Sequence, residues 1–250
     1  MIRTPDNHAV LIDVGSMTVS DLRRRLLTPY LRSVGCSTVD EVILSHGDYG
    51  RISGAAEVFA DYGRPAFFTN PQFAREVMGD LPAEDFLETV LDADRAPGIL
   101  HEGDRLNLSG GATLDVLWPP MDCAMSSNNC ALVLKLTYAG RSVIFASEIQ
   151  EAAERELWEN PGPLECDVLV APGRGSAEAG TAEFLRATGA RVILVSCEAK
   201  LSRKEKVFDL VAKPREVYRT GRCGAVTVTI DSRGGVGVDS FLGGNGGNAE

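Results

Sequence analysis

Short apolar runs alternate with longer amphipathic stretches through the first part of the chain. The apolar runs are too short for buried helices and predict strands. They are Ala9–Asp13, Val39–Leu44 and Ala66–Thr69. The amphipathic stretches predict helices, which Pro and Gly residues split or end. These helices cover Thr18–Val34, split by Pro29, then Ile52–Tyr62, ended by Gly63, and the mixed acidic segment 71–93.

Residues 97–118 contain short strands and glycine-rich turns. After them, the second half of the chain again alternates apolar runs with amphipathic stretches. Ala131–Tyr138 and Arg141–Phe145 predict a hairpin. Further strands are expected at Cys166–Ala171, Arg191–Ser196, Glu216–Arg219 and Ala225–Ile230, and helices at Glu148–Trp158, Ala177–Thr188 and Lys204–Ala212. Two mixed halves predict an α/β fold in which two sheets pack face to face with helices outside, a four-layer αββα sandwich.

Composition narrows the classes of protein. A chain of 250 residues with 44% hydrophobic content can bury a full core in one domain. The net charge of −10 argues against general nucleic-acid binding over the whole surface. The N-terminus has no apolar signal segment, and no apolar run approaches the roughly 20 residues of a membrane span. We therefore expect a cytoplasmic protein without an intrinsic membrane segment.

The six cysteines show no Cys-x-x-Cys spacing, which excludes a zinc knuckle or a redox pair of that type. Several lie within apolar runs, so we expect buried, reduced thiols.

One polar turn, Ser45–Arg51, follows the strand that ends at Leu44. His46 and Asp48 stand two apart on it, close enough to share one ligand. A turn between a strand and a helix displays side chains beside the helix N-terminus. The alternative is a plain turn, in which Asp48 accepts from the local backbone and His46 is a partly buried polar residue.

Two later turns have similar alternatives. Ser147–Gln150 matches a capping box in which Ser147 and Gln150 bond to each other's backbone. Pro172–Ser176 lies between a strand and a helix. It predicts either an anion-binding nest or a plain turn with Ser176 as the helix cap.

In this order the segments resemble the metallo-β-lactamase-fold domain at the C-terminus of DNA-internalisation (ComEC-type) competence proteins. That family shows Leu-Ile-Asp-x-Gly, Ser-His-x-Asp-x-Asp-His-x-Gly-Gly, an Asn ahead of a hairpin, Thr-Gly-Asp and Pro-His-His-Gly-Ser. The resemblance covers about residues 9–230. The matching positions are Asp13, Gly15, Pro29, Tyr30, Leu31, Ser45, His46, Asp48, Gly54, Asn129, Gly175, Ser176, Ser196 and Gly224.

The departures fall on the metal ligands. The resemblance implies a hydrolase whose two divalent metals activate a bridging water. Where the family has Asp and His after His-x-Asp, this chain has Gly50 and Arg51. The Asp of Thr-Gly-Asp is Glu148, and the two His of His-His-Gly-Ser are Gly173 and Arg174.

A dinuclear zinc centre is therefore excluded. The chain has three histidines, and neither His8 nor His101 matches a family ligand position, whereas imidazole-based zinc sites use two or three per metal. We expect no cofactor. The rival expectation is a hydrolase with one divalent cation held by His46, Asp48 and Glu148, for which Mn²⁺ or Mg²⁺ is better suited than a zinc pair.

The replacements suggest that arginines take the place of the metal. Without a cation, Asp48 and Glu148 would be uncompensated, and a guanidinium carries a permanent charge on a planar fork that suits carboxylates. We expect Arg51 and Arg174 to balance them. The degenerate site comprises Asp13, His46, Asp48, Gly50, Arg51, Glu148, Arg174 and Ser176.

The stretch from Lys200 to Arg222 carries eight basic residues against three acidic ones. It could hold a phosphate backbone, or it is a solvated helix face. The candidates for phosphate or nucleic-acid contact are Arg203, Lys204, Lys206 and Arg219.

Together these features predict one domain over residues 1–242 and a disordered Gly/Asn-rich tail over 243–250. Family domains have a strand upstream of the one matching Ala9–Asp13, for which we find no room here. The favoured function is a metal-free binding or scaffold module. The other readings are the single-metal hydrolase and a non-catalytic nucleic-acid-binding module. The resemblance implies DNA or a membrane-channel partner, and membrane association if the chain is part of a longer protein. The sequence indicates no oligomeric state.

Overall fold

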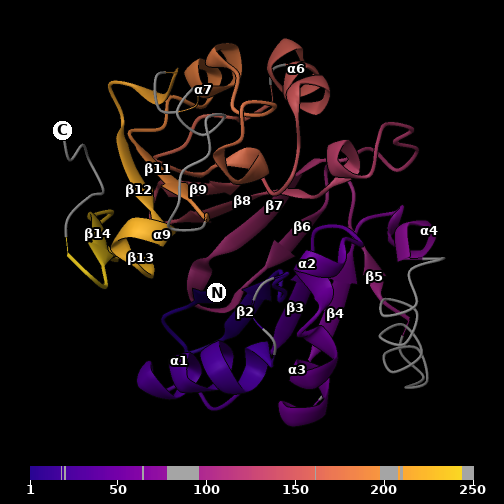
Figure 1. The fold of residues 1–250 in the computed structure, drawn as a ribbon. Helices are drawn as coiled ribbons and strands as arrows, with labels where there is room; N and C mark the ends of the chain where they lie inside the picture. The colour runs from indigo at the N-terminus through magenta and orange to yellow at the C-terminus, as the bar shows by residue number, and fades with distance from the viewer. Residues whose placement is uncertain are drawn as a thin grey trace. The chain divides into compact units, whose positions relative to one another are not determined.

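The computed structural model describes residues 1–17, 19, 21–63, 65–77, 96–160, 162–197, 208 and 211–243. The chain divides into two compact units, each with its own main sheet (Figure 1). The first unit comprises Met1–Glu102, Leu108–Gly110 and Pro119–Leu132, and the second comprises Gly103–Asn107, Gly111–Trp118 and Val133–Glu250.

The sheet of the first unit has five strands in sequence order, β1-β2-β3-β4-β5. They are β1 (Ile2–Arg3), β2 (Ala9–Ile12), β3 (Glu41–Leu44), β4 (Ala66–Thr69) and β5 (Gly98–Ile99). Only β1 runs antiparallel to its neighbour, and the other pairs are parallel. The expectation that no strand fits before Ala9 is wrong, because Ile2 and Arg3 pair with Val10 and Ala9.

The second unit has a seven-stranded sheet of order β12-β11-β10-β9-β8-β7-β6 and a separate hairpin. The strands are β6 (Arg105–Asn107), β7 (Thr113–Trp118), β8 (Val133–Tyr138), β9 (Arg141–Phe145), β10 (Val168–Val170), β11 (Val192–Val195) and β12 (Glu216–Arg219), and the hairpin is β13 (Val226–Ile230) with β14 (Val236–Ser240). Strands β6 to β9 are antiparallel and β9 to β12 are parallel, so the sheet is mixed, as predicted.

The helices lie close to the predicted positions, but most of them are shorter than predicted. They are α1 (Thr28–Ser33), α2 (Tyr49–Ile52), α3 (Ala55–Asp61), α4 (Phe73–Val77), α6 (Glu151–Glu159), α7 (Ala182–Thr188) and α9 (Thr220–Cys223), with a π-helical segment at Arg23–Leu27 before α1. Pro29 lies in the first turn of α1, where its missing N–H costs nothing. The predicted helix over Ile52–Tyr62 is divided in two, with Gly54 at the start of α3. Most of the predicted helices over 71–93 and Lys204–Ala212 lies outside the described residues.

Two predicted helix caps are wrong. α6 begins at Glu151 after Gln150, whose side chain makes no capping hydrogen bond, and Ser147 has a left-handed backbone (φ 48°) that no capping box uses. α7 begins at Ala182, where the side chain of Thr181 accepts the N–H of Phe184. Ser147 and Ser176 therefore belong to the turns that precede these helices.

The core of the first unit forms between β2–β4 and the helices that follow them. Phe59, Phe67 and Phe73 stack edge to face, with ring centroids 5.5 and 5.8 Å apart. Such contacts add to the burial of aromatic surface, which dominates the stability of small cores. The buried neighbours include Leu11, Val42, Leu44, Ile52 and Val58.

The cysteines do not all stay reduced as predicted, because Cys123 and Cys130 form a disulfide. Cys36, Cys166, Cys197 and Cys223 are free. Burial raises the pKa of the Cys166 thiol to about 12, so this thiol stays protonated and unreactive at neutral pH.

No helix in the described parts of the chain has the length and apolar character needed to cross a bilayer.

In the second unit, Glu154 is buried on α6 and ties that helix to the start of α7. Its carboxylate accepts the N–H of Gly180 and both the N–H and the hydroxyl of Thr181. Burial raises the pKa of this carboxyl, while the three donors lower it.

Replacing Glu154 with alanine should lower the free energy of unfolding by about 2–3 kcal/mol, because three donors would lose their acceptor in a dry environment. Urea denaturation measures the change. Glu159→Ala, at an exposed position on the same helix, is the matched control and should change stability by less than about 0.5 kcal/mol. Equal effects of the two variants would contradict the role of Glu154 in holding α6 to the start of α7.

Candidate functional site

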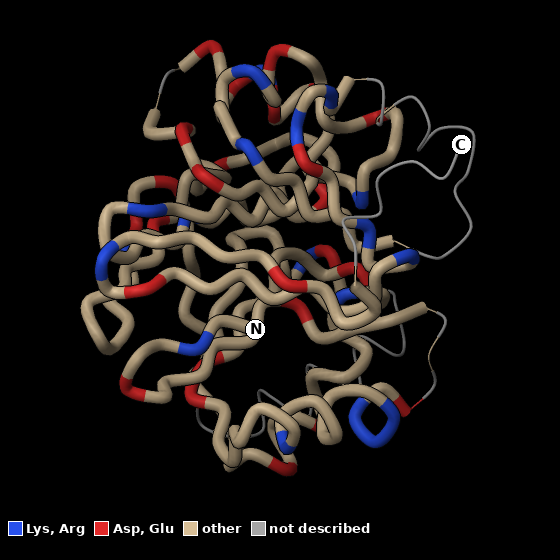
Figure 2. The backbone as a smooth tube through the Cα atoms, turned by 90° about the vertical axis from the view of Figure 1, so that its left-hand side faces the viewer, with Lys and Arg blue, Asp and Glu red and all other residues tan. Residues whose placement is uncertain are grey.

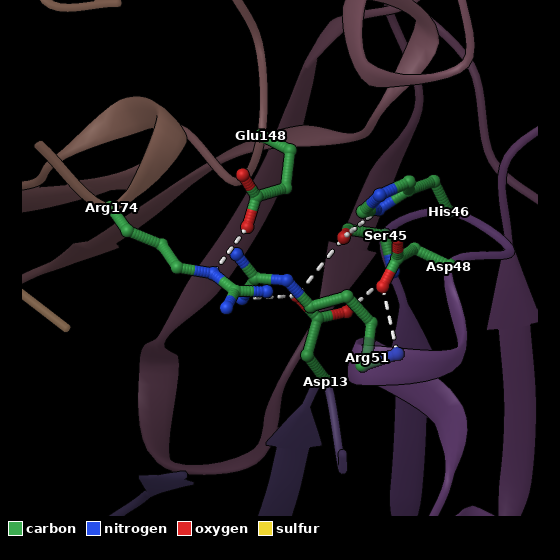
Figure 3. Close-up of polar contacts among 8 residues, drawn as sticks. Asp13, Ser45, His46, Asp48, Arg51, Glu148 and Arg174 are labelled. Atoms are coloured by element: carbon green, nitrogen blue, oxygen red, sulfur yellow. Dashed lines mark hydrogen bonds and ion pairs between the residues drawn. The ribbon is translucent and has the colours of Figure 1, made fainter. Parts of the chain in front are cut away.

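In the first unit, the Asp13 carboxylate gathers the residues that follow β2 and β3 (Figure 3). Its Oδ1 accepts the N–H of Ser45 at 2.8 Å, and its Oδ2 accepts the Ser45 hydroxyl at 3.0 Å. Arg51 donates from Nη1 to Oδ2 at 3.3 Å. Asp13 itself has a left-handed backbone (φ 55°), a conformation that costs a non-glycine residue about 1 kcal/mol or more. Because β2 and β3 are parallel, their carboxyl ends meet at one edge of the sheet and bring these residues together.

His46 is completely buried, and the hydrogen bonds of Ser45 assign its tautomer. The Ser45 hydroxyl gives its single proton to Asp13, so it accepts from His46 Nδ1 at 3.1 Å (Figure 3). Nδ1 therefore carries the proton in the neutral ring, and Nε2 is the acceptor nitrogen. The chain Asp13–Ser45–His46 presets the imidazole to offer Nε2 to a donor or a cation.

Asp48 has the local role that the plain-turn alternative predicts. Its Oδ1 accepts the N–H of Gly50 at 2.7 Å and caps the N-terminus of α2 (Figure 3). Asp48 is exposed, so water also compensates its charge. Arg51 pairs with Asp13, a carboxylate outside the expected set of Asp48 and Glu148.

A close backbone approach explains why Arg51 reaches Asp13. The N–H of Val14 donates to the carbonyl of Arg51 at 2.7 Å. A Cβ on Gly15 would lie 2.5 Å from the carbonyl oxygen of Gly50. Gly15 thus allows the chain after β2 to lie against α2, as the Asp-x-Gly motif requires.

The second unit holds the second predicted pair. Arg174 Nε donates to Glu148 Oε1 at 2.8 Å (Figure 3). The Glu148 side chain is 15% exposed and that of Arg174 is 46% exposed. Glu148 is one of the two carboxylates that the arginines were expected to balance.

The turn that presents Arg174 has an unusual backbone. Gly173, Arg174 and Gly175 all have positive φ (53°, 56° and 71°). The N–H of Gly173 donates to the carbonyl of Ser147 at 2.9 Å, and the N–H of Ser176 turns back to the carbonyl of Gly173 at 3.0 Å. These two N–H groups are therefore engaged by backbone carbonyls and not by an anion, and the nest at Pro172–Ser176 stays a prediction.

The metal pair that the resemblance implies does not fit these residues. Asp13 and Glu148 each use carboxylate oxygens to bind a guanidinium, and Asp48 caps a helix. Within the described part of the chain, no three His, Cys, Asp or Glu side chains are grouped as a metal site needs. The single-cation set of His46, Asp48 and Glu148 draws on both units and stays a prediction.

Of the four candidates for nucleic-acid contact, the structure describes only Arg219. Arg203, Lys204 and Lys206 lie outside the described residues. Arg219 is 1% exposed, with its guanidinium carbon 5.8 Å from the centre of the Phe208 ring, so it does not lie on a surface in this structure. Basic and acidic positions are interspersed along the described backbone (Figure 2).

The sequence did not predict a role for Glu76, which binds the backbone of the histidine turn. We use this name for the turn Ser45–Asp48, which carries His46. Glu76 lies on α4 and accepts the N–H of Gly47 through Oε2 at 2.8 Å. A Cβ on Gly47 would lie 2.7 Å from Cβ of Glu76, so the glycine between His46 and Asp48 lets α4 approach. Burial raises the pKa of Glu76, against the hydrogen bonds from Gly47, Ser127 and Asn70. Gly47 was the one local feature of the sequence that could have indicated this contact with α4.

A family model described as the metallo-beta-lactamase superfamily matches residues 1–197. The search of curated proteins found no match.

Among solved structures, the metallo-beta-lactamase fold protein YhfI from Bacillus subtilis has 14% sequence identity and a TM-score of 0.51, covering 86% of this chain and 85% of that one. A beta-lactamase from Chitinophaga pinensis has 16% identity and a TM-score of 0.48, covering 85% and 86%. A HARLDQ-motif mutant of the metallo-beta-lactamase from Cronobacter sakazakii has 19% identity and a TM-score of 0.47, covering 75% and 84%. Since the family model covers most of the sequence, this chain belongs to the metallo-beta-lactamase superfamily and has its fold.

Proposed function

We propose that this chain is a metal-free binding module of the metallo-beta-lactamase superfamily, in which guanidinium groups replace the metal. The observation that carries the proposal is that both arginines at former ligand positions bind carboxylates of the site motifs. Arg51 binds Asp13 in one unit, and Arg174 binds Glu148 in the other. The charge of each carboxylate is compensated within its own unit.

Electrostatics supports this function over hydrolysis. A guanidinium stays charged at every physiological pH and lies where a divalent cation would need to approach the carboxylate. A cation could bind only after displacing it, which would leave an unpaired charge in a half-buried place. Without a divalent cation the site cannot activate a water in the way that the family's two metals do.

One observation favours the second candidate, a single-metal hydrolase. His46 is held as the tautomer whose Nε2 accepts, which is the form that ligates metals. The same tautomer also suits a hydrogen-bond donor on a bound ligand, so metal content separates the two functions.

The resemblance to competence proteins supports DNA as the ligand class of the binding module. The basic stretch Lys200–Arg222 supplies the charge, with Arg203, Lys204 and Lys206 as the contacts. A membrane-channel partner follows from the same resemblance.

Protein purified without chelators should contain far less than one Mn, Mg or Zn ion per chain by elemental analysis, because no carboxylate pair is open to a cation. Added Mn²⁺ should leave the melting temperature unchanged. In the variant Arg51→Ala with Arg174→Ala, the freed carboxylates should bind Mn²⁺ and raise the melting temperature. Arg155→Ala, which breaks the exposed Arg155–Glu151 pair, is the control. About one bound ion in the wild-type protein would make the chain a hydrolase candidate again.

Breaking the Arg174–Glu148 pair should cost stability in a coupled way. Arg174→Ala should lower the free energy of unfolding by about 1 kcal/mol, since Arg174 is half exposed, and most of this cost should vanish when Glu148→Gln is already present. A double-mutant cycle in urea measures the coupling. Additive effects would mean that the pair carries no charge compensation.

DNA binding should weaken steeply with salt and by at least about tenfold in the variant Arg203→Glu with Lys204→Glu. Fluorescence anisotropy with a labelled oligonucleotide measures the dissociation constant. The variant Arg105→Glu with Arg155→Glu makes the same change in net charge at exposed positions elsewhere, and should have a smaller effect. If both variants weaken binding equally, the basic stretch is not the contact.

A further inference from the structure

A cavity of about 330 Å³ opens in the first unit beside α4. One wall carries the charged side chains of α4, and the other carries the loop that the disulfide closes. Its lining residues are Arg75, Glu76, Ala124, Met125, Ser127 and Cys130. The proposed function uses none of this cavity.

The disulfide between Cys123 and Cys130 joins residues seven apart and closes that loop. Both cysteines are buried, at 7% and 1% exposure. Cys130 lines the cavity, so a small molecule held there lies beside the disulfide.

The two ends of the loop hold the turn between β4 and α4. Asn70 Nδ2 donates to the carbonyl of Cys130 at 2.8 Å, and Gln72 Nε2 donates to the carbonyl of Cys123 at 3.1 Å. Both amide side chains are buried, so their positions depend on these carbonyls.

The same network continues to the histidine turn. Asn70 Nδ2 also lies 3.4 Å from Glu76 Oε1, and Glu76 Oε2 accepts the N–H of Gly47. Leu132, two residues beyond the loop, donates its N–H to the carbonyl of Ser45 at 2.9 Å. The disulfide thus supports the Ser45–Asp48 turn from two directions.

We infer that Cys123–Cys130 is a thiol–disulfide exchange site for a small anionic thiol, and that its reduction releases the histidine turn. The thiolate attacks Sγ of Cys130, forming a mixed disulfide, and Cys123 leaves as a thiolate that takes a proton from water. A second thiol then attacks the mixed disulfide, so that two protein thiols and one small-molecule disulfide result.

The cavity selects the class of thiol. Its volume admits a small molecule and excludes a folded redox protein. The exposed Arg75 at the cavity favours an anion, whereas the half-buried Glu76 is engaged by Gly47, Ser127 and Asn70. For a chain in the cytoplasm, as the sequence predicts, disulfides are typically transient or redox-sensing.

The exchange is tested on the full-length wild-type chain under native conditions. The chain is treated with 2-mercaptoethanesulfonate or with 2-mercaptoethanol, thiols of similar size that differ in charge. Alkylation and peptide mapping then follow Cys123 and Cys130 separately from the four other cysteines. We expect both cysteines to become alkylatable, and the sulfonate to react at least about threefold faster at low salt. Arg75→Ala should remove that preference.

Release of the turn is read from amide hydrogen exchange. Reduction should speed exchange of the Gly47 N–H by at least about tenfold, while amides of β10 in the second unit keep their rates. Glu76→Ala should give fast exchange at Gly47 before reduction, and Glu76→Gln, which keeps an acceptor, should stay close to wild type.

Three results would overturn the proposal. They are a disulfide that reacts only in denatured protein, equal rates for the two thiols, and unchanged exchange at Gly47 after reduction. The variant Cys123→Ser with Cys130→Ser should behave like the reduced chain. Because reduction of the wild-type protein gives the same readouts, the test does not depend on the folding of that variant.

Discussion

Everything at the first unit's sheet edge depends on the hydrogen bonds of one carboxylate. Asp13 holds β2 and β3 together at their ends through the N–H and hydroxyl of Ser45, and it binds Arg51 with an oxygen that already accepts from Ser45. The left-handed backbone of Asp13 is maintained against its cost by these bonds. Through Ser45 the carboxylate also sets the tautomer of His46. One charged group therefore fixes strand pairing, ring orientation and charge balance.

In the second unit an arginine also pairs with a carboxylate, but the backbone that positions the two residues is different. Ser147 and Arg174 both have positive φ, and the turn of Arg174 is bonded to the carbonyl of Ser147. Strain of this kind persists only where surrounding bonds over-determine it. Here the bond between the two turns holds Glu148 and Arg174 within reach of each other.

The histidine turn has a support that is independent of these ion pairs. Glu76 reaches the turn from α4, and the disulfide loop reaches α4 through buried amides. The amides of Asn70 and Gln72 in this network are buried, so loss of one link is felt at the next. The ion pair at Asp13 and the disulfide loop thus reach the Ser45–Asp48 turn through separate contacts.

The sequence by itself determined the α/β class, most strand positions and the metallo-beta-lactamase superfamily, because apolar runs and motif spacing are local properties of the chain. It also indicated that the arginines at former ligand positions would pair with carboxylates of the site, since guanidinium and carboxylate groups are the charges at those positions. Tertiary structure alone decided that Arg51 binds Asp13, that Ser147 is not a helix cap, and that Glu76 and the disulfide support the histidine turn. These depend on close approaches between segments distant in sequence, such as Gly15 against Gly50 and Gly47 against α4, and no periodicity along the chain encodes such distances.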